Sequence, residues 1–174
     1  MDFLSDLEAS VPALRRYARA LLRDRDSADD LVHDCIARAL SRRHLWRPRG
    51  TVRAWLFTIM HHLHANDRRR RAGEPRHRSL DDADLAVPGH PAGQGDRLAL
   101  RDLGDALLLL VPEQREALLM IALEGLSYEE VARIQGVAVG TVMSRLSRGR
   151  DRLRALTEGE GEGEGAPPVL RRIK

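Results

Sequence analysis

The sequence predicts an all-α protein, with two small helical domains joined by a flexible linker, and three observations support this. The chain of 174 residues is built mainly from Ala, Leu, Arg and Glu, which are good helix formers. Apolar residues recur at helical spacing in two separate blocks. Between the blocks, residues 76–95 contain two prolines and three glycines and lack that spacing. We therefore predict domains at 1–75 and 96–156, a linker at 76–95 and a disordered tail at 157–174.

The first block contains three predicted helices. The first holds Leu14 and Tyr17 on one face, and Pro12 suits its first turn. The second runs from about residue 27 to 43, after a polar break, and the third runs from about 52 to 71. Residues expected in the protein core include Leu21, Leu31, Cys35, Trp46, Trp55, Phe57, Ile59, Leu63 and Tyr128.

The second block is predicted to be a four-helix domain. An apolar helix ends before Pro112, and another covers about residues 113–124. Ser127 and Glu130 have the spacing of a capping box, in which each side chain bonds a free backbone N–H at the start of a helix. Gly136 then provides a tight turn before a basic helix at about 139–156. Helix, short glycine turn and basic helix are typical of a helix-turn-helix.

Charge distribution indicates a nucleic-acid partner. The formal charge is +3, and 28 of the 29 basic residues are arginines. Residues 1–75 carry a net charge of +5, residues 96–139 carry −4, and residues 140–156 carry +4. A short basic helix beside an acidic scaffold suits binding to a DNA duplex. A genome rich in GC would explain the preference for arginine over lysine, but not this distribution of charge.

Composition excludes several other classes of protein. Aromatic residues make up 3% of the chain, which argues against a base-stacking surface for single strands. The single cysteine, Cys35, excludes an internal disulfide and a cysteine zinc finger. We see no signal peptide, membrane-spanning run or phosphate-binding loop, and no catalytic pattern stands out. We expect a cytoplasmic protein without enzymatic activity, cofactor or small-molecule substrate.

Three long motifs resemble those of the extracytoplasmic-function (ECF) group of bacterial RNA polymerase sigma factors. They are "RDRDSADDLVHD" at 23–34, "RAWLFTIMHHLHANDRRRR" at 53–71 and "LEGLSYEEVARIQGVAVGTVMSRLSRGRDRL" at 123–153. The segments "VPALRRYARALL" and "GTVRAWLFTI" are similar to those of the alphaproteobacterial general-stress sigma factors. The resemblance implies an alternative sigma factor that binds RNA polymerase core, directs it to promoter DNA and is held by an anti-sigma factor.

The resemblance also assigns roles to individual residues. It implies contacts to the −35 element for Thr141, Met143, Ser144, Arg145, Ser147 and Arg148. It implies contacts to the −10 element for Arg53, His61, His62, Asn66, Arg68 and Arg69. It implies docking on the clamp helices of the largest polymerase subunit for Asp29, Asp30, Asp34 and Arg38.

Some of these assignments have alternatives. Asp29 and Asp30 also suit the start of a helix capped near Ser27, through the helix dipole alone. The linker acids, Asp81, Asp82 and Asp84, are candidates for mimics of nucleic-acid charge.

Three histidines close together in the sequence, His61, His62 and His64, raise the question of a metal site. We predict none, because at most two of them share a helix face and we see no carboxylate or thiol to complete a site.

A rival function is that of a sigma-like decoy, which binds an anti-sigma factor and never starts transcription. His62 and Met143 depart from the family pattern and would fit such a mimic. Arg148 and the Arg68–Arg71 run favour a true sigma factor, because a decoy has little need of them. A simple one-component repressor leaves the first block unexplained.

Overall fold

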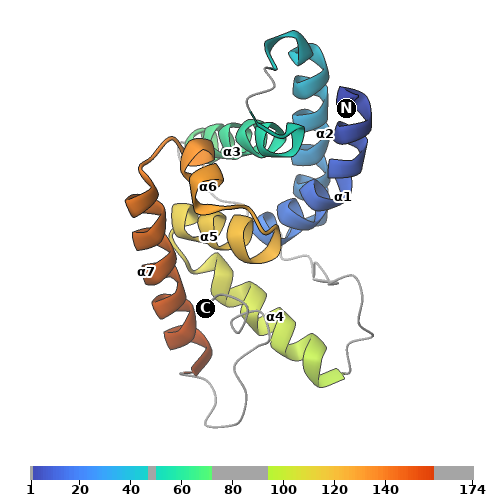
Figure 1. The fold of residues 1–174 in the computed structure, drawn as a ribbon. Helices are drawn as coiled ribbons and strands as arrows, with labels where there is room; N and C mark the ends of the chain where they lie inside the picture. The colour runs from blue at the N-terminus through green and yellow to red at the C-terminus, as the bar shows by residue number, and fades with distance from the viewer. Residues whose placement is uncertain (1, 47–49, 72–93, 159–174) are drawn as a thin grey trace.

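The computed structural model describes residues 2–46, 50–71 and 94–158, which form helices and turns without a β-strand. The first domain contains α1 (Phe3–Leu22), α2 (Arg25–Ser41), a short 3-10 turn η1 (Arg43–Leu45) and α3 (Val52–Arg71). The second contains α4 (Gln94–Leu108), α5 (Pro112–Leu118), a π-helical turn η2 (Leu119–Leu123), α6 (Tyr128–Gln135) and α7 (Val139–Glu158). The all-α, two-domain prediction is confirmed (Figure 1).

The core of the first domain lies where α1, α2 and α3 meet. Tyr17 and Phe57 are fully buried, and their rings meet edge to face with centroids 5.1 Å apart. Cys35 is also fully buried, and its Sγ lies 3.4 Å from the backbone oxygen of Leu56. Trp46, Trp55, Leu63 and Tyr128, which we expected in the core, are only partly buried and pack against it.

The predicted start of the first helix is wrong. Helix α1 begins at Phe3, where the side chain of Asp2 caps it by accepting from the Leu4 N–H. Pro12 therefore lies in the middle of the helix rather than in its first turn. The added turns are held by tertiary packing, because Leu7 is buried and Phe3 contacts the rings of Trp46 and Trp55. Such packing outweighs the hydrogen bond that proline removes.

Helix α2 also begins earlier than predicted, at Arg25. Its N-cap is Asp24, whose carboxylate accepts from the Ser27 N–H at 2.9 Å, so Ser27 is not the cap. Asp29 and Asp30 therefore lie beyond the first turn, where the helix dipole has little effect. The dipole explanation for these two acids is weakened as a result.

The second domain builds the helix-turn-helix as predicted. Ser127 and Glu130 form the reciprocal capping box, with bonds of 3.2 and 2.9 Å. Gly136 ends α6 in the left-handed region at φ 65°, which glycine adopts without strain. Helix α7 packs closely on α5 at Gly149, where an added Cβ would lie 2.8 Å from the side chain of Leu118. The predicted 113–124 helix is interrupted, because its second half is a π-helical turn.

The two domains pack against each other. Helix α6 of the second domain packs against one end of α3 of the first (Figure 1), and the π-helical turn contacts α1. Most of the predicted linker, residues 76–93, lies outside the described residues, as do its three acids, and α4 already begins at Gln94. Nearly all of the predicted tail also lies outside them, although α7 extends to Glu158. In the described ranges, no helix combines the length and apolarity that a bilayer span needs.

The burial of Cys35 predicts an unreactive thiol. Burial raises the pKa of Cys35 to about 12, and a backbone hydrogen bond from Met60, which lowers the pKa, does not offset the burial, so little nucleophilic thiolate forms at neutral pH. We expect no labelling of the native protein by a thiol reagent over minutes, and full labelling in urea. Rapid labelling of the native state would contradict a core role and revive a redox one.

Candidate nucleic-acid interface

Helix α7 presents most of the residues predicted to meet the −35 element. Thr141, Met143, Ser144, Ser147 and Arg148 are all exposed, while Val142, Leu146 and Leu153 are buried against the rest of the domain. The 3.6-residue period separates these two faces along the helix. These exposed members of the predicted −35 set therefore combine one long guanidinium with short polar side chains and a methionine.

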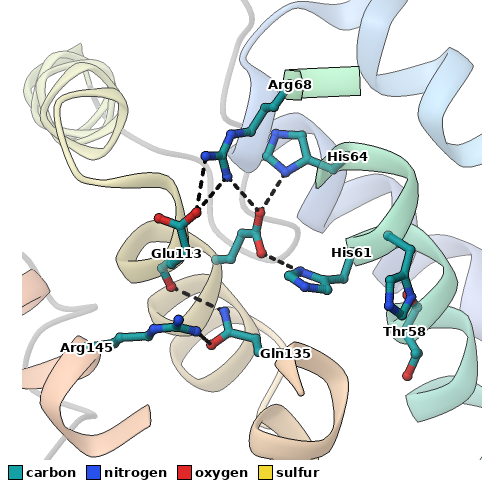
Figure 2. A network of polar contacts seen from close by, with 9 residues as sticks. Thr58, His61, His64, Arg68, Glu113, Gln135 and Arg145 are labelled. Atoms are coloured by element: carbon teal, nitrogen blue, oxygen red, sulfur yellow. Dashed lines mark hydrogen bonds and ion pairs between the residues drawn. The ribbon is translucent and has the colours of Figure 1, made fainter. Parts of the chain in front are cut away.

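Arg145 is the exception in this set. It is partly buried, and its Nη1 donates to Gln135 Oε1 at 2.7 Å. Gln135 in turn donates to the backbone oxygen of Glu113 at 3.2 Å, which links α7, α6 and α5 (Figure 2). Arg145 thus fixes the recognition helix on its scaffold, a role that spacing alone did not indicate.

The residues predicted to meet the −10 element lie on α3 and fall into two groups. His62, Asn66 and Arg69 are exposed. His62 Nδ1 lies 2.8 Å from the backbone oxygen of Thr58, and Arg69 donates to Asn66 at 2.9 Å. These three side chains remain on the surface of the closed molecule.

Arg53, His61 and Arg68 are only partly exposed, although a contact to the −10 element needs an accessible side chain. All three turn toward the second domain. Arg53 Nη2 donates to the backbone oxygen of Glu124 at 2.7 Å, and Arg68 donates to Glu113 at 3.1 Å. His61 keeps only 15% of its side chain exposed. Half of the predicted −10 set therefore contacts the second domain.

Glu116 of α5 is the centre of one polar cluster between the domains. Its side chain is 1% exposed. Its two oxygens lie 2.6 Å from His61 Nδ1 and 2.7 Å from His64 Nδ1, with Arg68 Nη1 at 4.0 Å (Figure 2). His61 and His64 are three residues apart on α3, so both face the same carboxylate.

Glu124 forms a second cluster. Its side chain is fully buried. Arg16 of α1 donates to it from Nε at 3.0 Å and from Nη2 at 2.7 Å, which is a bidentate contact, and Arg53 donates to it at 2.9 Å. The π-helical turn ends at this residue, with the Glu124 N–H bonded to the Leu119 oxygen. Such turns often occur at functional positions.

In the Glu116 cluster, two histidines and a carboxylate come together. The sequence offers no carboxylate near His61 and His64 along the chain, but Glu116 approaches them from the other domain. Its oxygens lie at hydrogen-bonding distance from both rings. Among the described residues, no group of three or more such side chains is arranged to hold a metal ion.

The electrostatics of Glu116 predict an acid-sensitive contact. Burial by itself would raise the Glu116 pKa, but hydrogen bonds and charge from His61 and His64 lower it from 4.5 to about 2. A depressed carboxyl pKa stabilises the folded state above the unfolded pKa, and this contribution disappears as pH falls from about 4.5 toward 2. We expect urea unfolding to show that wild type loses more stability than Glu116→Gln between pH 5 and pH 3. Parallel losses would contradict the assignment.

Helix α2 presents the residues predicted to dock on the polymerase. Asp30 and Asp34 are exposed, and Arg38 is partly exposed on the same face one turn later. Asp29 forms a 3.7 Å ion pair with Arg19, so it is partly engaged within the domain. Asp30 and Asp34 are both exposed to solvent.

The described residues place two basic helices on separate domains, one of them in a helix-turn-helix, a layout typical of DNA-binding proteins. Comparisons with known proteins identify the class. The domain family described as "Sigma2 domain of PhyR" matches residues 7–61, and "Sigma-70, region 4" matches residues 100–153.

Curated relatives agree along most of the chain. The ECF RNA polymerase sigma factor EcfG of Rhodopseudomonas palustris is 40% identical over 155 residues, which cover 87% of this chain and 82% of that protein. The ECF RNA polymerase sigma factor SigC of Mycobacterium tuberculosis is 38% identical, over 80% of this chain and 75% of that protein. The chain belongs to the ECF RNA polymerase sigma factors, and it is an alternative sigma factor.

A solved structure extends the comparison to three dimensions. The sigma factor RpoE of Bartonella quintana, crystallised with the anti-sigma factor NepR, has a TM-score of 0.75 at 35% identity. The match covers 92% of this chain and 99% of that one. The anti-anti-sigma factor PhyR of the same organism, at 17% identity, shares the fold.

Proposed function

We propose that the two domains divide the work of promoter recognition. The first domain docks on RNA polymerase core through α2 and faces the −10 element through α3. The second domain reads the −35 element through α7. One observation carries this proposal: a chain of the sigma family has an exposed face on α7 in one domain and a basic helix, α3, in the other.

At the −35 element, Arg148 is the residue best suited to read sequence. Its exposed guanidinium can offer two parallel donors to a guanine edge. Thr141, Ser144 and Ser147 are short and suit positioning contacts to phosphate or water. Met143 is 51% exposed and offers an apolar contact, for example to a thymine methyl group.

At the −10 element, the exposed His62 and Asn66 are placed to contact bases, and Arg68 and Arg69 to contact phosphate. His62 is held by its bond to Thr58, which orients the ring on the surface of α3. The run of four arginines at the end of α3 adds attraction that falls as salt rises.

The docking surface on polymerase is proposed to be the α2 stripe of Asp30, Asp34 and Arg38, with Asp29 beside it. Asp30 and Asp34 are exposed, and the helix dipole does not explain them because both lie beyond the first turn of α2. Clamp helices of the largest polymerase subunit are the partner that the family implies. The chain then acts in the cytoplasm, performs no reaction itself and needs no cofactor, because the polymerase supplies the chemistry.

Regulation by an anti-sigma factor in a stress response is the other part of the proposal. The relative from Bartonella quintana was crystallised with such a partner, and it matches this chain over 99% of its own length. The similarity to EcfG supports the general-stress subgroup.

A decoy remains the second candidate because one observation favours it. The family that matches the first domain is named after PhyR, and PhyR structures described as anti-anti-sigma factors share the fold. Against it, this chain covers only 49% of the PhyR chain, and its identity to EcfG is far higher.

Run-off transcription separates the two functions. Purified chain and polymerase core are incubated with fragments of the source genome, and transcript starts are mapped. The sigma proposal predicts discrete starts that require the chain. Binding to an anti-sigma factor without any chain-dependent transcript would establish the decoy instead.

A further inference from the structure

The outer stripe of α3 carries polar side chains whose hydrogen-bonding polarity is determined by the helix itself. Thr58, His62 and Asn66 are spaced four residues apart, so they follow one another along one face of the helix. His62 and Asn66 are exposed, and so is Arg69, less than one turn further on. Both His62 and Asn66 already make one hydrogen bond within α3. That bond decides what each side chain still offers to a partner.

The His62 ring presents an acceptor to solvent. Its Nδ1 lies 2.8 Å from the backbone oxygen of Thr58, and a carbonyl oxygen only accepts, so Nδ1 carries the proton and donates. A neutral imidazole has one donor and one acceptor nitrogen, which leaves Nε2 as the acceptor. The His61 ring packs edge-on against His62, with centroids 5.5 Å apart, and restricts its rotation. His62 therefore directs a nitrogen lone pair outward.

The Asn66 amide presents the opposite polarity. Its Oδ1 accepts a hydrogen bond from Arg69 Nη1 at 2.9 Å. The oxygen and the amino group lie on opposite sides of the amide carbon, so an amide whose oxygen is turned to Arg69 points its amino group away from it. That amino group carries two N–H donors. Without Arg69, the amide could turn over and offer its oxygen instead, because the two orientations have nearly the same shape.

We propose that His62 and Asn66 together recognise one unpaired base of the −10 element as an acceptor and a donor, with Arg69 as the positioning residue for the amide. The inference rests on the proposed function, because it needs α3 to face the −10 element. Transcription begins on separated strands, where Watson–Crick edges are free to be read. On that edge, adenine and cytosine place an amino group beside a ring-nitrogen acceptor, which complements His62 Nε2 and Asn66 Nδ2.

Guanine and thymine do not complement this pair in the same register. Each has an oxygen where adenine and cytosine have the amino group, and the neighbouring ring nitrogen carries a hydrogen. The oxygen would face the His62 lone pair, and the ring N–H would face the Asn66 amino group. Both contacts would leave polar groups without a partner, which costs binding free energy. An asparagine at position 62 could rotate to suit either pattern, so His62 narrows the choice of base.

Arg69 can hold the amide and a phosphate together. A guanidinium has five N–H donors, and the bond to Asn66 uses one of them. A phosphate bound by the remaining donors would keep the DNA backbone at a constant distance from the Asn66 amide. The same side chain thus helps to set the register in which the base meets His62 and Asn66.

The test measures base preference with holoenzyme assembled from polymerase core and the full chain. A promoter found by run-off transcription is prepared with its −10 region held unpaired by mismatches, so that base-pair strength does not contribute. Each of the four bases is placed in turn at every −10 position of the non-template strand, and binding is measured by competition. We expect adenine and cytosine to be preferred at one position by about tenfold, the size of a good paired contact to a base.

Hypoxanthine and His62→Asn test the polarity of the contact. Hypoxanthine in place of adenine exchanges the amino group for an oxygen and adds a hydrogen to the ring nitrogen. Wild type should bind it as weakly as guanine at that position. His62→Asn should lose most of the preference, because its amide can turn either way. A preference for guanine or thymine in wild type, or an unchanged preference in His62→Asn, would overturn the proposal.

Arg69→Met and Arg70→Met form a matched pair for the positioning role. Both remove one exposed charge from the same arginine run, but Arg70 donates to Asp67 and not to Asn66. We expect both variants to bind all templates more weakly, because each loses attraction to phosphate. Only Arg69→Met should relax the base preference. Equal preferences in the two variants would overturn the role of Arg69. Co-elution with polymerase core checks that every variant is folded.

Run-off transcription with wild type keeps the two claims apart. If specific transcripts form but the base preference does not depend on His62 and Arg69, the proposed function stands and only this inference fails. If no transcript depends on the chain, the proposed function fails, and the inference that rests on it fails as well.

Discussion

Replacing Phe57 with alanine is expected to destabilise the first domain by about 3–5 kcal/mol, the usual cost of removing a buried phenylalanine. The Phe57 ring is fully buried, packs edge to face on Tyr17 and lies 5.6 Å from the guanidinium carbon of Arg53. Its loss leaves a cavity where α1 meets α3. Urea unfolding followed by circular dichroism measures the change in free energy.

Trp55→Ala provides the matched comparison for Phe57→Ala. Trp55 lies on the same helix and is larger, but it is only partly buried, so the structure predicts a smaller loss of stability. Position along the helix, and not ring size, decides the effect. A larger loss for Trp55→Ala than for Phe57→Ala would show that the core has been wrongly located.

Replacing Arg148 with alanine is expected to reduce selective binding to a −35 promoter duplex by about 10–100-fold, because a good bidentate contact to a base contributes about 1–3 kcal/mol of discrimination. Binding to random duplex should fall much less. Fluorescence anisotropy at one fixed salt concentration, with both duplexes, measures the ratio.

Arg152→Ala is the control for Arg148→Ala, because Arg152 is also exposed on α7, one turn further along. We expect it to weaken both duplexes alike, as a phosphate contact does. If Arg148→Ala also weakened both duplexes equally, Arg148 would be a phosphate contact and not a reader of sequence.

Features with local signals could be predicted from sequence. The limits of α3 and the capping box of Ser127 and Glu130 were correct, because short-range spacing and backbone capping determine them. The left-handed turn at Gly136 likewise followed from a single residue type. The helix-turn-helix, and most of the exposed face of α7, could therefore be placed without coordinates.

Features that depend on contacts between distant segments could not be predicted from the sequence. The start of α1 depends on Phe3 reaching Trp46 and Trp55, and no local pattern outweighs Pro12. The roles of Glu116 and Glu124 depend on residues more than fifty positions away, such as His61 and Arg16. The one sequence signal for them was the net charge of the blocks, with an acidic 96–139 facing a basic 1–75. That complementarity did not identify the pairs.

The binding of this chain to RNA polymerase tests the central claim most directly. Core enzyme without a specificity subunit is mixed with the purified full chain and passed over a size-exclusion column, with an established ECF sigma factor as the positive control. We predict that the chain elutes with the core at micromolar concentrations. Elution as the free protein, under conditions where the control co-elutes, would contradict its role as a sigma factor.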